Sequence, residues 1–500
     1  MPATLESQNS DGRPAAAVGL FRQALQHQAQ NQSLEAARCY AQALHSAPDF
    51  FEAAFNLGLL FQKIGRLEGA IECYSRAVRL RPDYVAAWSN QGLALRDLGR
   101  NPEAVTSLEH ARRLAPASAS VLNNLGNAPR SVWRHDEAIA AFREALRYDA
   151  GNAGIHENLG NALRETGQAA EAEASLERAV KLQPDLAEAH WDLAFARLLQ
   201  GDLAQGLEEY EWRWRRPDFS RRSFGQPLWK GEDLAGRTLL VHTEQGAGDA
   251  IQFVRFTAAL AGRGGRILLE CPRALAALFA SAEGISEIIV RGDRLPGFDW
   301  QVPLLSVPHR LGTRLETIPA RVPYLRAGAE RQISLPTLPV RKGALKVGLV
   351  WQGNPKHKND RNRSISLRQL EPLLGLNNIA YYSLQPESSD LRSDQIGQAK
   401  IADLSGSMGD YADTAALVEQ LDLVLAVDTS VAHLAGALGR PVWVLLSFAP
   451  DWRWLTERED SPWYPTARLF RQPAAGDWAS VIERVGAELG RVAEKIACER

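Results

Sequence analysis

The chain has 500 residues, of which 45% are apolar and 23% charged, and its formal net charge is -2 at pH 7. This length exceeds what one hydrophobic core normally supports, so we expect two to four domains. The charge shows no global basic excess, which argues against nucleic acid or an anionic membrane as the main partner.

The N-terminal stretch has no apolar segment behind a basic start, and apolar runs such as 423–427 are only as long as a strand. We therefore expect neither a secretion signal nor a membrane span. Four scattered cysteines without a CxxC pair predict no disulfide framework and no zinc site, and they fit a reducing cytoplasm. The sequence contains no Asp-x-Asp triplet, so we expect neither a metal nor another cofactor.

A period of 34 residues runs through residues 17–220 and resembles the helix-turn-helix units of the tetratricopeptide family. A small residue recurs where the two helices of a unit must approach closely, at Ala24, Gly58, Gly92, Gly126, Gly160 and Ala194. A bulky residue recurs in the second helix, at Tyr40, Tyr74, Leu108, Phe142, Leu176 and Tyr210. About six such units predict a right-handed superhelix whose concave surface binds a partner.

Asparagines also recur one repeat apart on the first helices, at Asn90, Asn124 and Asn158. In the grooves of protein-modifying glycosyltransferases built from such repeats, an asparagine ladder holds the backbone of the bound polypeptide. The ladder here predicts a groove for a protein or peptide acceptor. Duplication of one repeat would produce the same spacing without any binding role, so both interpretations stay open.

Residues 221–235 form an aromatic and basic joint, after which short apolar strands alternate with helices. The pattern predicts an N-terminal Rossmann-like lobe over 236–330, a second lobe over 343–475 and a closing helix over 476–497. Two doubly wound lobes that face each other across a cleft describe the α/β GT-B architecture. Ligands of such sheets bind at the carboxyl ends of the strands.

The loop after the first strand contains Gly246, Gly248 and Asp249. Its glycines allow a sharp turn that can aim the carboxylate of Asp249 into the cleft, where it can take a proton from an acceptor hydroxyl. The alternative is a plain turn in which Asp249 caps the helix that follows.

A second motif follows the strand at 423–427, where Asp428, Thr429 and Ser430 begin a helix and His433 lies one turn further on. Free backbone NH groups and the helix dipole at such a start favour a phosphate. The same residues also suit a simple cap, and a single histidine on a helix is more often structural.

A basic loop follows the strand that opens the second lobe, with Lys356, Lys358, Arg361, Arg363 and Ser364. Its cations can neutralise a diphosphate leaving group without a metal, or they can simply be solvated. Gln385 ends the next strand and is a candidate for contacting the base or ribose, with a buried polar residue at the sheet edge as the alternative.

These motifs, in their order and spacing, resemble the lipopolysaccharide heptosyltransferases of glycosyltransferase family nine, especially its tetratricopeptide-fused bacterial branch. The similarity covers 236–475 and includes the ending PDWRWLTEREDSPWYPTARLFRQ at 450–472. The resemblance implies that Asp249 is the general base and that Asp428, Thr429 and His433 form the donor loop, with Arg363 and Ser364 near the phosphate. Ser430 replaces the family's usual glycine. The layout also resembles protein O-linked N-acetylglucosamine transferases.

The resemblance implies an inverting, metal-independent transfer of a sugar from a nucleotide-sugar to a hydroxyl acceptor. The repeat array favours a protein acceptor. Two alternatives remain: a transferase that acts on lipopolysaccharide or another glycan, and a non-catalytic scaffold that senses a nucleotide-sugar. The donor sugar, the base and the oligomeric state do not follow from the sequence.

Overall fold

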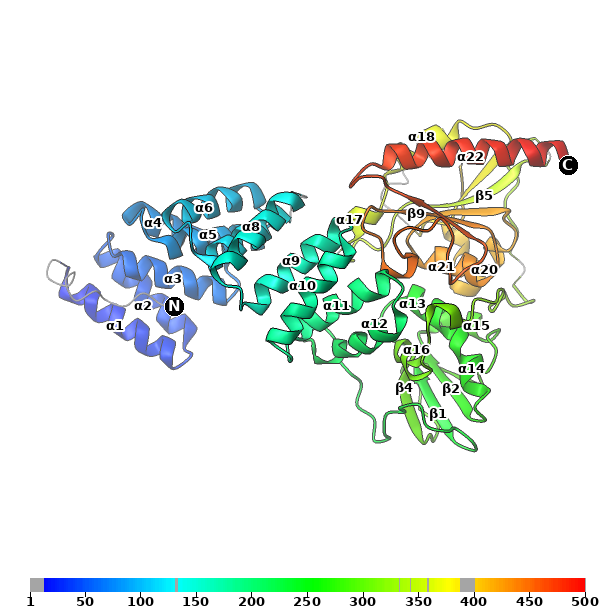
Figure 1. Ribbon diagram of the computed structural model, residues 1–500, viewed down its shortest axis with the longest axis horizontal. Coiled ribbons are helices and arrows are strands. Elements are labelled where there is room, and N and C mark those ends of the chain that lie inside the picture. The colour runs from blue at the N-terminus through cyan, green and yellow to red at the C-terminus, as the bar shows by residue number, and fades with distance from the viewer. Residues whose placement is uncertain are drawn as a thin grey trace. The chain divides into compact units, whose positions relative to one another are not determined.

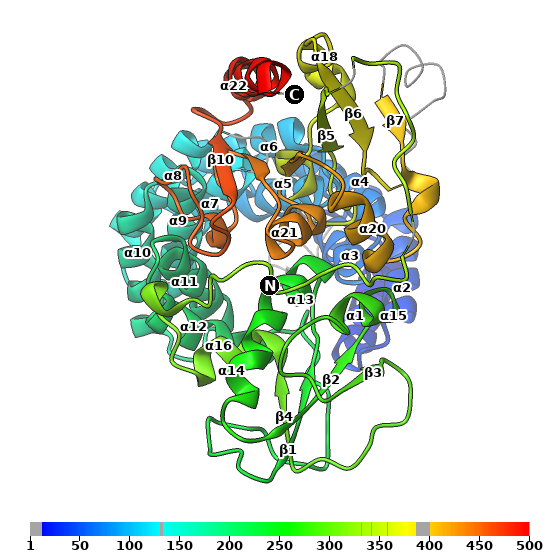
Figure 2. The same cartoon turned by 90° about the vertical axis from the view of Figure 1, so that its right-hand side faces the viewer.

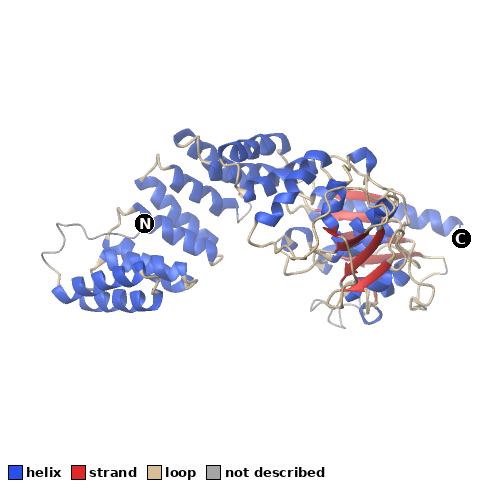
Figure 3. Cartoon of the chain, turned by 90° about the horizontal axis from the view of Figure 1, so that it is seen from below, coloured by secondary structure: helices blue, strands red, loops and turns tan. Residues whose placement is uncertain are grey.

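A computed structural model describes residues 13–130, 134–331, 333–341, 343–357, 359–386 and 401–499. The chain divides into two compact units, residues 1–189 and 190–500. The described strands all lie in the second unit, and the first is built from helices (Figure 3).

The first unit is a series of antiparallel helix pairs (Figure 1). Its helices are α1 (Ala15–Ala29), α2 (Ser33–Ser46), α3 (Phe51–Lys63), α4 (Leu67–Leu80), α5 (Val85–Asp97), α6 (Asn101–Leu114), α7 (Ala119–Arg130), α8 (His135–Tyr148), α9 (Ala153–Glu165) and α10 (Ala169–Leu182). Each helix packs mainly on its neighbours along the chain, and one hydrophobic cluster extends from Ala17 of α1 to Ala128 of α7, with smaller clusters in the helices that follow.

The predicted close approach of the two helices at the small positions is confirmed, and the bulky positions lie opposite them. A Cβ added at Gly92 of α5 would lie 2.5 Å from Leu108 Cγ of α6, and one at Gly58 of α3 would lie 2.7 Å from Tyr74 Cε1 of α4. The two helices of a pair are therefore too close for any side chain at these positions. This is why the sequence repeats a small residue there.

Replacing Gly92 by Ala is expected to lower the free energy of unfolding by about 1–3 kcal/mol, because the new methyl group meets Leu108 and also lies 3.1 Å from the Ala104 carbonyl oxygen. Gly19 in α1 is the matched control, because its Cβ would meet nothing within 4 Å. Gly19→Ala should stabilise by up to about 1 kcal/mol through helix propensity alone. Urea unfolding followed by circular dichroism measures both, and equal shifts would contradict the close packing.

The second unit begins with the remainder of α11 (Ala187–Leu199), followed by α12 (Leu203–Tyr210) and the short helix η1 (Glu211–Arg215). The repeat pattern assigns these helices to a sixth tetratricopeptide unit. In the structure Leu198 and Leu207 share one hydrophobic core with Trp229 and Leu239 of the α/β region. The last helix pair is therefore built into the α/β unit.

The first sheet is parallel, with strand order β3-β2-β1-β4. Its strands are β1 (Thr238–His242), β2 (Arg266–Cys271), β3 (Glu287–Val290) and β4 (Trp300–Pro303). One face packs against α13 (Ala247–Phe253), η2 (Val254–Phe256), α14 (Thr257–Ala261), α15 (Arg273–Phe279), η3 (Leu304–Ser306) and α16 (Val307–Arg310).

The other face of this sheet corrects one prediction. Leu240, Leu268 and Ile289 pack there against Phe224, Leu295 and Phe298, which all come from irregular segments. The fully described connection 291–299 from β3 to β4 forms no helix. The first lobe therefore has a helical layer on one face, whereas a doubly wound lobe would have one on both.

The second sheet is also parallel, with order β10-β9-β8-β5-β6-β7. Its strands are β5 (Leu345–Val350), β6 (Ile379–Ser383), β7 (Ile401–Asp403), β8 (Leu423–Val427), β9 (Val442–Leu446) and β10 (Ala467–Arg471). Helices α18 (Leu367–Leu374) and α22 (Trp478–Glu499) cover one face, and α20 (Tyr411–Val418) and α21 (Ser430–Ala437) cover the other (Figure 2). Side chains of β8 alternate between the two cores, as strand geometry requires.

The strand orders identify where ligands are expected. The direction of strand addition reverses between β1 and β4 in the first sheet and between β5 and β8 in the second. Open parallel sheets bind ligands in the crevice at the carboxyl ends of the two strands that flank such a reversal. Ligands are therefore expected at the loops after β1, β4, β5 and β8.

Candidate functional site

Helix α13, which follows β1, packs closely against α21, which follows β8. A Cβ added at Gly248 would lie 3.0 Å from His433 Cδ2 and 3.4 Å from Ser430 Cα. Gly248 thus permits the approach of the two helices, a role beyond the loop turn expected from the sequence. The approach brings α13, the helix of the first lobe that carries Asp249, against the Asp428–His433 motif of the second.

Asp249 is engaged through both carboxylate oxygens. Its Oδ2 accepts a hydrogen bond of 2.9 Å from the backbone NH of Gly246, so it caps α13 as the alternative interpretation predicted. Its Oδ1 forms an ion pair with Arg453 Nη2 of the second lobe, at 2.5 Å. A capping role alone does not account for this second contact.

Arg453 lies in the short helix η6 (Trp452–Trp454) and its side chain is only 8% exposed. It also pairs with Asp451 Oδ1 at 2.8 Å and donates to Gln252 Oε1 at 2.7 Å. Burial raises the pKa of Asp451, but the charge of Arg453 and the hydrogen bonds from its backbone and side chain together outweigh burial and leave that pKa below its ordinary value. A buried cation therefore joins carboxylates from both lobes.

The sequence interpretation assigned no role to Arg453 or Asp451. Both lie within 450–460, in the motif that contributed to the family resemblance. The sequence therefore marks these residues as part of a motif but does not indicate what they do. Only the packing of η6 against α13 shows what these two side chains contact.

Asp428, Thr429 and Ser430 follow directly on β8. Burial, reinforced by the neighbouring Asp451, raises the pKa of Asp428 to about 6, so this carboxyl titrates near neutrality. Thr429 Oγ1 is a buried hydroxyl with no hydrogen-bond partner among the described residues, although Thr429 is the N-cap of α21. Ser430 Oγ accepts a hydrogen bond of 2.8 Å from Tyr411. The helix start therefore retains an unsatisfied hydroxyl at the sheet edge where ligands are expected.

His433 is buried, and its Nδ1 lies 3.0 Å from the Tyr464 hydroxyl while its ring stacks on Trp454. Burial, together with Arg453, lowers the pKa of His433 to about 3. The imidazole is thus neutral at pH 7 and cannot neutralise a diphosphate by charge. Its remaining capacity is a hydrogen bond from Nε2, which lies 3.9 Å from Asp428 Oδ1.

Arg363 ends α17 (Asp360–Arg363) in the basic loop after β5, and its Nη1 donates to the Asp428 carbonyl oxygen at 3.0 Å. It thereby connects the loops after β5 and β8, and its side chain is 17% exposed. Ser364 Oγ accepts from the Gly353 NH at 2.9 Å and donates to Asp360 at 3.0 Å, which fixes the loop. Lys358 lies outside the described residues.

Gln385 is buried just beyond the end of β6, where its side-chain amide bonds to main-chain groups just beyond the end of β5. Its Oε1 accepts from the NH groups of Trp351 and Gln352, at 3.3 and 3.0 Å, and its Nε2 donates to the Gln352 carbonyl at 3.2 Å. These contacts match a buried polar residue at the sheet edge, the second of the two interpretations given for it.

In the repeat array, Asn124 Nδ2 donates to Ser89 Oγ at 3.1 Å, and Asn158 Nδ2 donates to Asn123 Oδ1 at 3.0 Å. Both bonds join first helices of adjacent repeats. At the corresponding position before Asn90 stands Phe55, which has no polar side chain to accept such a bond. Part of the asparagine ladder therefore stabilises the array itself.

Among the described residues, no three or more His, Cys, Asp or Glu side chains are grouped so that they could hold a metal ion. No helix in the described part of the chain is both long and apolar enough to cross a bilayer.

The fold defines a tetratricopeptide-repeat array followed by an α/β region with two parallel sheets. Residues 21–85, 56–119 and 89–154 match the family described as Tetratricopeptide repeat, and residues 160–201 match the one described as TPR repeat. The chain is similar to Protein FlbA of Caulobacter vibrioides (strain ATCC 19089 / CIP 103742 / CB 15), at 28% identity over 347 residues. The alignment covers 61% of this chain and 55% of FlbA, so the chain spans about half the length of this relative.

Solved structures similar to this chain include MamA from Desulfovibrio magneticus RS-1, with 19% identity and a TM-score of 0.34 over 35% of this chain and 99% of that one. TTC0263, a thermophilic TPR protein from Thermus thermophilus, has 23% identity and a TM-score of 0.31 over 37% of this chain and 100% of that one.

Proposed function

We propose that the α/β unit is a glycosyltransferase that moves a sugar from a nucleotide-sugar to an acceptor hydroxyl, with inversion and without a metal. The observation that carries the proposal is the packing of α13, which carries Asp249, against the donor-type loop at Asp428–His433, where Gly248 lies next to Ser430 and His433. A candidate base and a candidate phosphate site thus lie together at the carboxyl ends of two parallel sheets.

In this proposal the diphosphate lies at the start of α21, where backbone NH groups, the Thr429 hydroxyl and Arg363 face it. Asp249 takes the proton of the acceptor hydroxyl while that oxygen bonds to the anomeric carbon. The bond from this carbon to the diphosphate oxygen breaks, and the nucleoside diphosphate leaves with the electron pair. Each carboxylate oxygen has two lone pairs, so the contacts to Gly246 and Arg453 leave Asp249 able to accept a proton.

One observation favours the scaffold alternative. Both oxygens of Asp249 already have partners, as would be expected if the residue only caps α13 and holds the lobes together. A non-catalytic unit that binds a nucleotide-sugar would keep these contacts and show no turnover. A glycan in place of a protein as acceptor would leave the same donor site unchanged.

Donor binding tests the proposal directly. The full chain in excess chelator should gain thermal stability with one member of a nucleotide-sugar panel, because a ligand at one hundred times its dissociation constant adds about 2.7 kcal/mol. Arg363→Gln should reduce the gain, whereas Arg368→Gln, which removes an exposed charge from α18, should not. No response to any nucleotide-sugar would contradict the proposal, and a response that requires added magnesium would contradict the metal-free mechanism.

We further propose that the array recruits a protein acceptor through the first helices. Replacing Asn90, Asn124 and Asn158 by Ala should reduce acceptor capture, measured by cross-linking and mass spectrometry, while the nucleotide-sugar response persists. Asn124→Ala and Asn158→Ala each also lose an inter-repeat hydrogen bond worth about 1 kcal/mol. Asn90→Ala alone is therefore the cleaner test, and unchanged capture in all four variants would rule out the ladder.

A further inference from the structure

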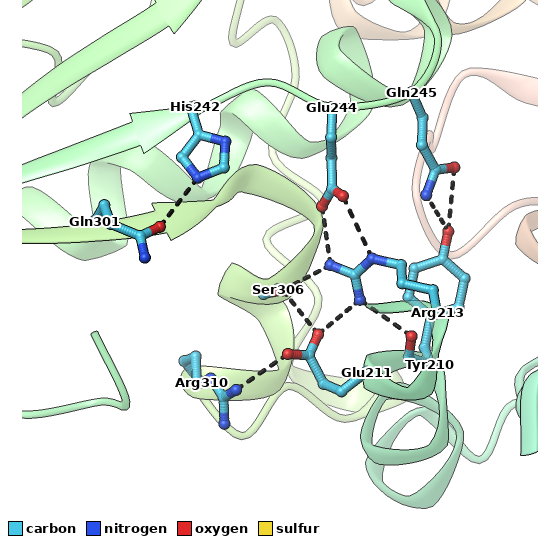
Figure 4. Close-up of polar contacts among 9 residues, drawn as sticks. All are labelled: Tyr210, Glu211, Arg213, His242, Glu244, Gln245, Gln301, Ser306 and Arg310. Carbon is cyan, nitrogen blue, oxygen red and sulfur yellow. Dashed lines mark hydrogen bonds and ion pairs between the residues drawn. The ribbon is translucent and has the colours of Figure 1, made fainter. Parts of the chain in front are cut away.

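The crevice between β1 and β4 of the first sheet is occupied by a side chain of the protein itself. Arg213 of η1 is fully buried there, with 0% of its side chain exposed. Figure 4 shows the polar side chains that surround its guanidinium. In the second sheet, the corresponding bridge between the loops after β5 and β8 is made by Arg363, which remains partly exposed. Arg213 thus fills the first crevice, whereas Arg363 at the second keeps part of its side chain exposed.

The Arg213 guanidinium joins the two loops that border its crevice. Its Nη2 donates to Glu244 Oε1 at 2.9 Å, in the loop after β1, and to Ser306 Oγ at 2.6 Å, in η3 after β4. Its Nε donates to Glu244 Oε2 at 3.3 Å, and its Nη1 donates to Glu211 Oε1 at 2.7 Å. The fork of donors therefore holds Glu244 through both carboxylate oxygens.

The charged side chains around Arg213 pair with one another within the second unit. Burial raises the pKa of Glu211, but Arg213, Ser306 and Arg310 together outweigh burial and leave that pKa below its ordinary value. Arg310 pairs with the other oxygen of Glu211 at 3.0 Å. The pKa of Glu244 is held above its ordinary value by burial in spite of Arg213. Two cations thus face two carboxylates, and loss of either partner would leave a buried charge unpaired.

The loop that Arg213 holds is the one that carries Asp249. Glu244 is followed by Gln245, whose φ of +56° is uncommon for a residue with a side chain. The side-chain amide of Gln245 donates to the Tyr210 hydroxyl at 2.8 Å. Gly246 comes next and donates to Asp249. Contacts from α12 and η1 therefore fix a strained loop immediately before the candidate base.

We propose that Arg213 is a positioning residue for sugar transfer: by holding Glu244 it sets the place of Asp249 relative to the donor loop. This inference rests on the proposed function. Misplacing a reacting group by about 1 Å can cost roughly a hundredfold in rate. Loss of the contact between Arg213 and Glu244 should therefore lower turnover much more than donor binding.

The test compares Glu244→Gln with Glu211→Gln in the full chain. Both variants remove one carboxylate from the same guanidinium, but only Glu244 belongs to the loop before Asp249. Hydrogen exchange of the amides at 245–249 should rise at least about tenfold in Glu244→Gln and less than about threefold in Glu211→Gln. Turnover should fall about 10²-fold in Glu244→Gln with KM for the nucleotide-sugar within about twofold of wild type.

Equal loop exchange in the two variants would overturn the inference, as would a Glu244→Gln variant that loses thermal stability without any selective change at 245–249. Arg213→Lys adds a second measurement, since one ammonium group keeps the charge but cannot hold Glu244 through both oxygens. It should reproduce the loop exchange of Glu244→Gln. The exchange measurements need no turnover. A failure of the proposed transferase activity is therefore distinguishable from a failure of the hypothesis that Arg213 holds the loop through Glu244.

Discussion

Replacing Asp249 by Asn is expected to lower sugar transfer by ~10² to 10⁴-fold, because an amide cannot take the proton of the acceptor hydroxyl. Nucleotide-sugar affinity should change little, since Asp249 lies on the first lobe and the donor loop on the second. Asn retains an oxygen that can accept from the Gly246 NH, so the cap on α13 persists. The ion pair with Arg453 is lost, and we expect the melting temperature to fall.

A matched control separates this loss of stability from loss of catalysis. Asp410 also caps a helix, accepting from the NH groups of Ala412 and Asp413, and also pairs with an arginine, Arg331, at 3.0 Å. Asp410→Asn should therefore lose similar contacts but keep turnover within about threefold. Steady-state rates measure turnover in the two variants, and donor titrations measure their affinity for the nucleotide-sugar. Near wild-type turnover in Asp249→Asn would remove Asp249 from the mechanism and favour the scaffold.

We expect two truncated chains with different starting residues to differ sharply in whether they fold. A chain beginning at Pro184 keeps α11, α12 and η1, and it should melt cooperatively and respond to the same nucleotide-sugar as the full chain. A chain beginning at Gly236 should fail to fold. It lacks Leu207, Tyr210 and other core side chains, each worth about 1.5–3 kcal/mol on burial. It also leaves Glu244 without Arg213, a loss of about 3–5 kcal/mol.

The sum of these losses is comparable to the whole stability of a typical domain, which is about 5–15 kcal/mol. Circular dichroism and thermal melts of the two truncated chains measure the outcome. A folded, donor-binding chain from Gly236 would show that the last helix pair is dispensable. If the chain from Pro184 modified the natural acceptor as efficiently as the full chain, recruitment by the array would be wrong.

The sequence by itself determined the helical array and the presence of two sets of parallel strands. Repeat contacts are local, so a fixed period directly encodes which positions meet, as Gly92 and Leu108 do. The glycines around Asp249 and the strand end before Asp428 are likewise local signals, and they located both halves of the candidate site. For Gln385 the sequence leaves two interpretations open, because it does not show that the side-chain amide bonds to the main chain of Trp351 and Gln352.

Only the tertiary structure decided which charges meet. Arg453 and Asp249 are 204 residues apart in the chain, and Arg213 and Ser306 are 93 apart. Their pairing follows from strand order and from the packing of α13 on α21, neither of which leaves a periodic trace in the sequence. Burial, which arises only on folding, also makes His433 neutral by penalising its charged form and so lowering its pKa. The same burial makes Arg213 a fixed part of the first lobe, because a desolvated guanidinium is stable only where folding brings carboxylates to it.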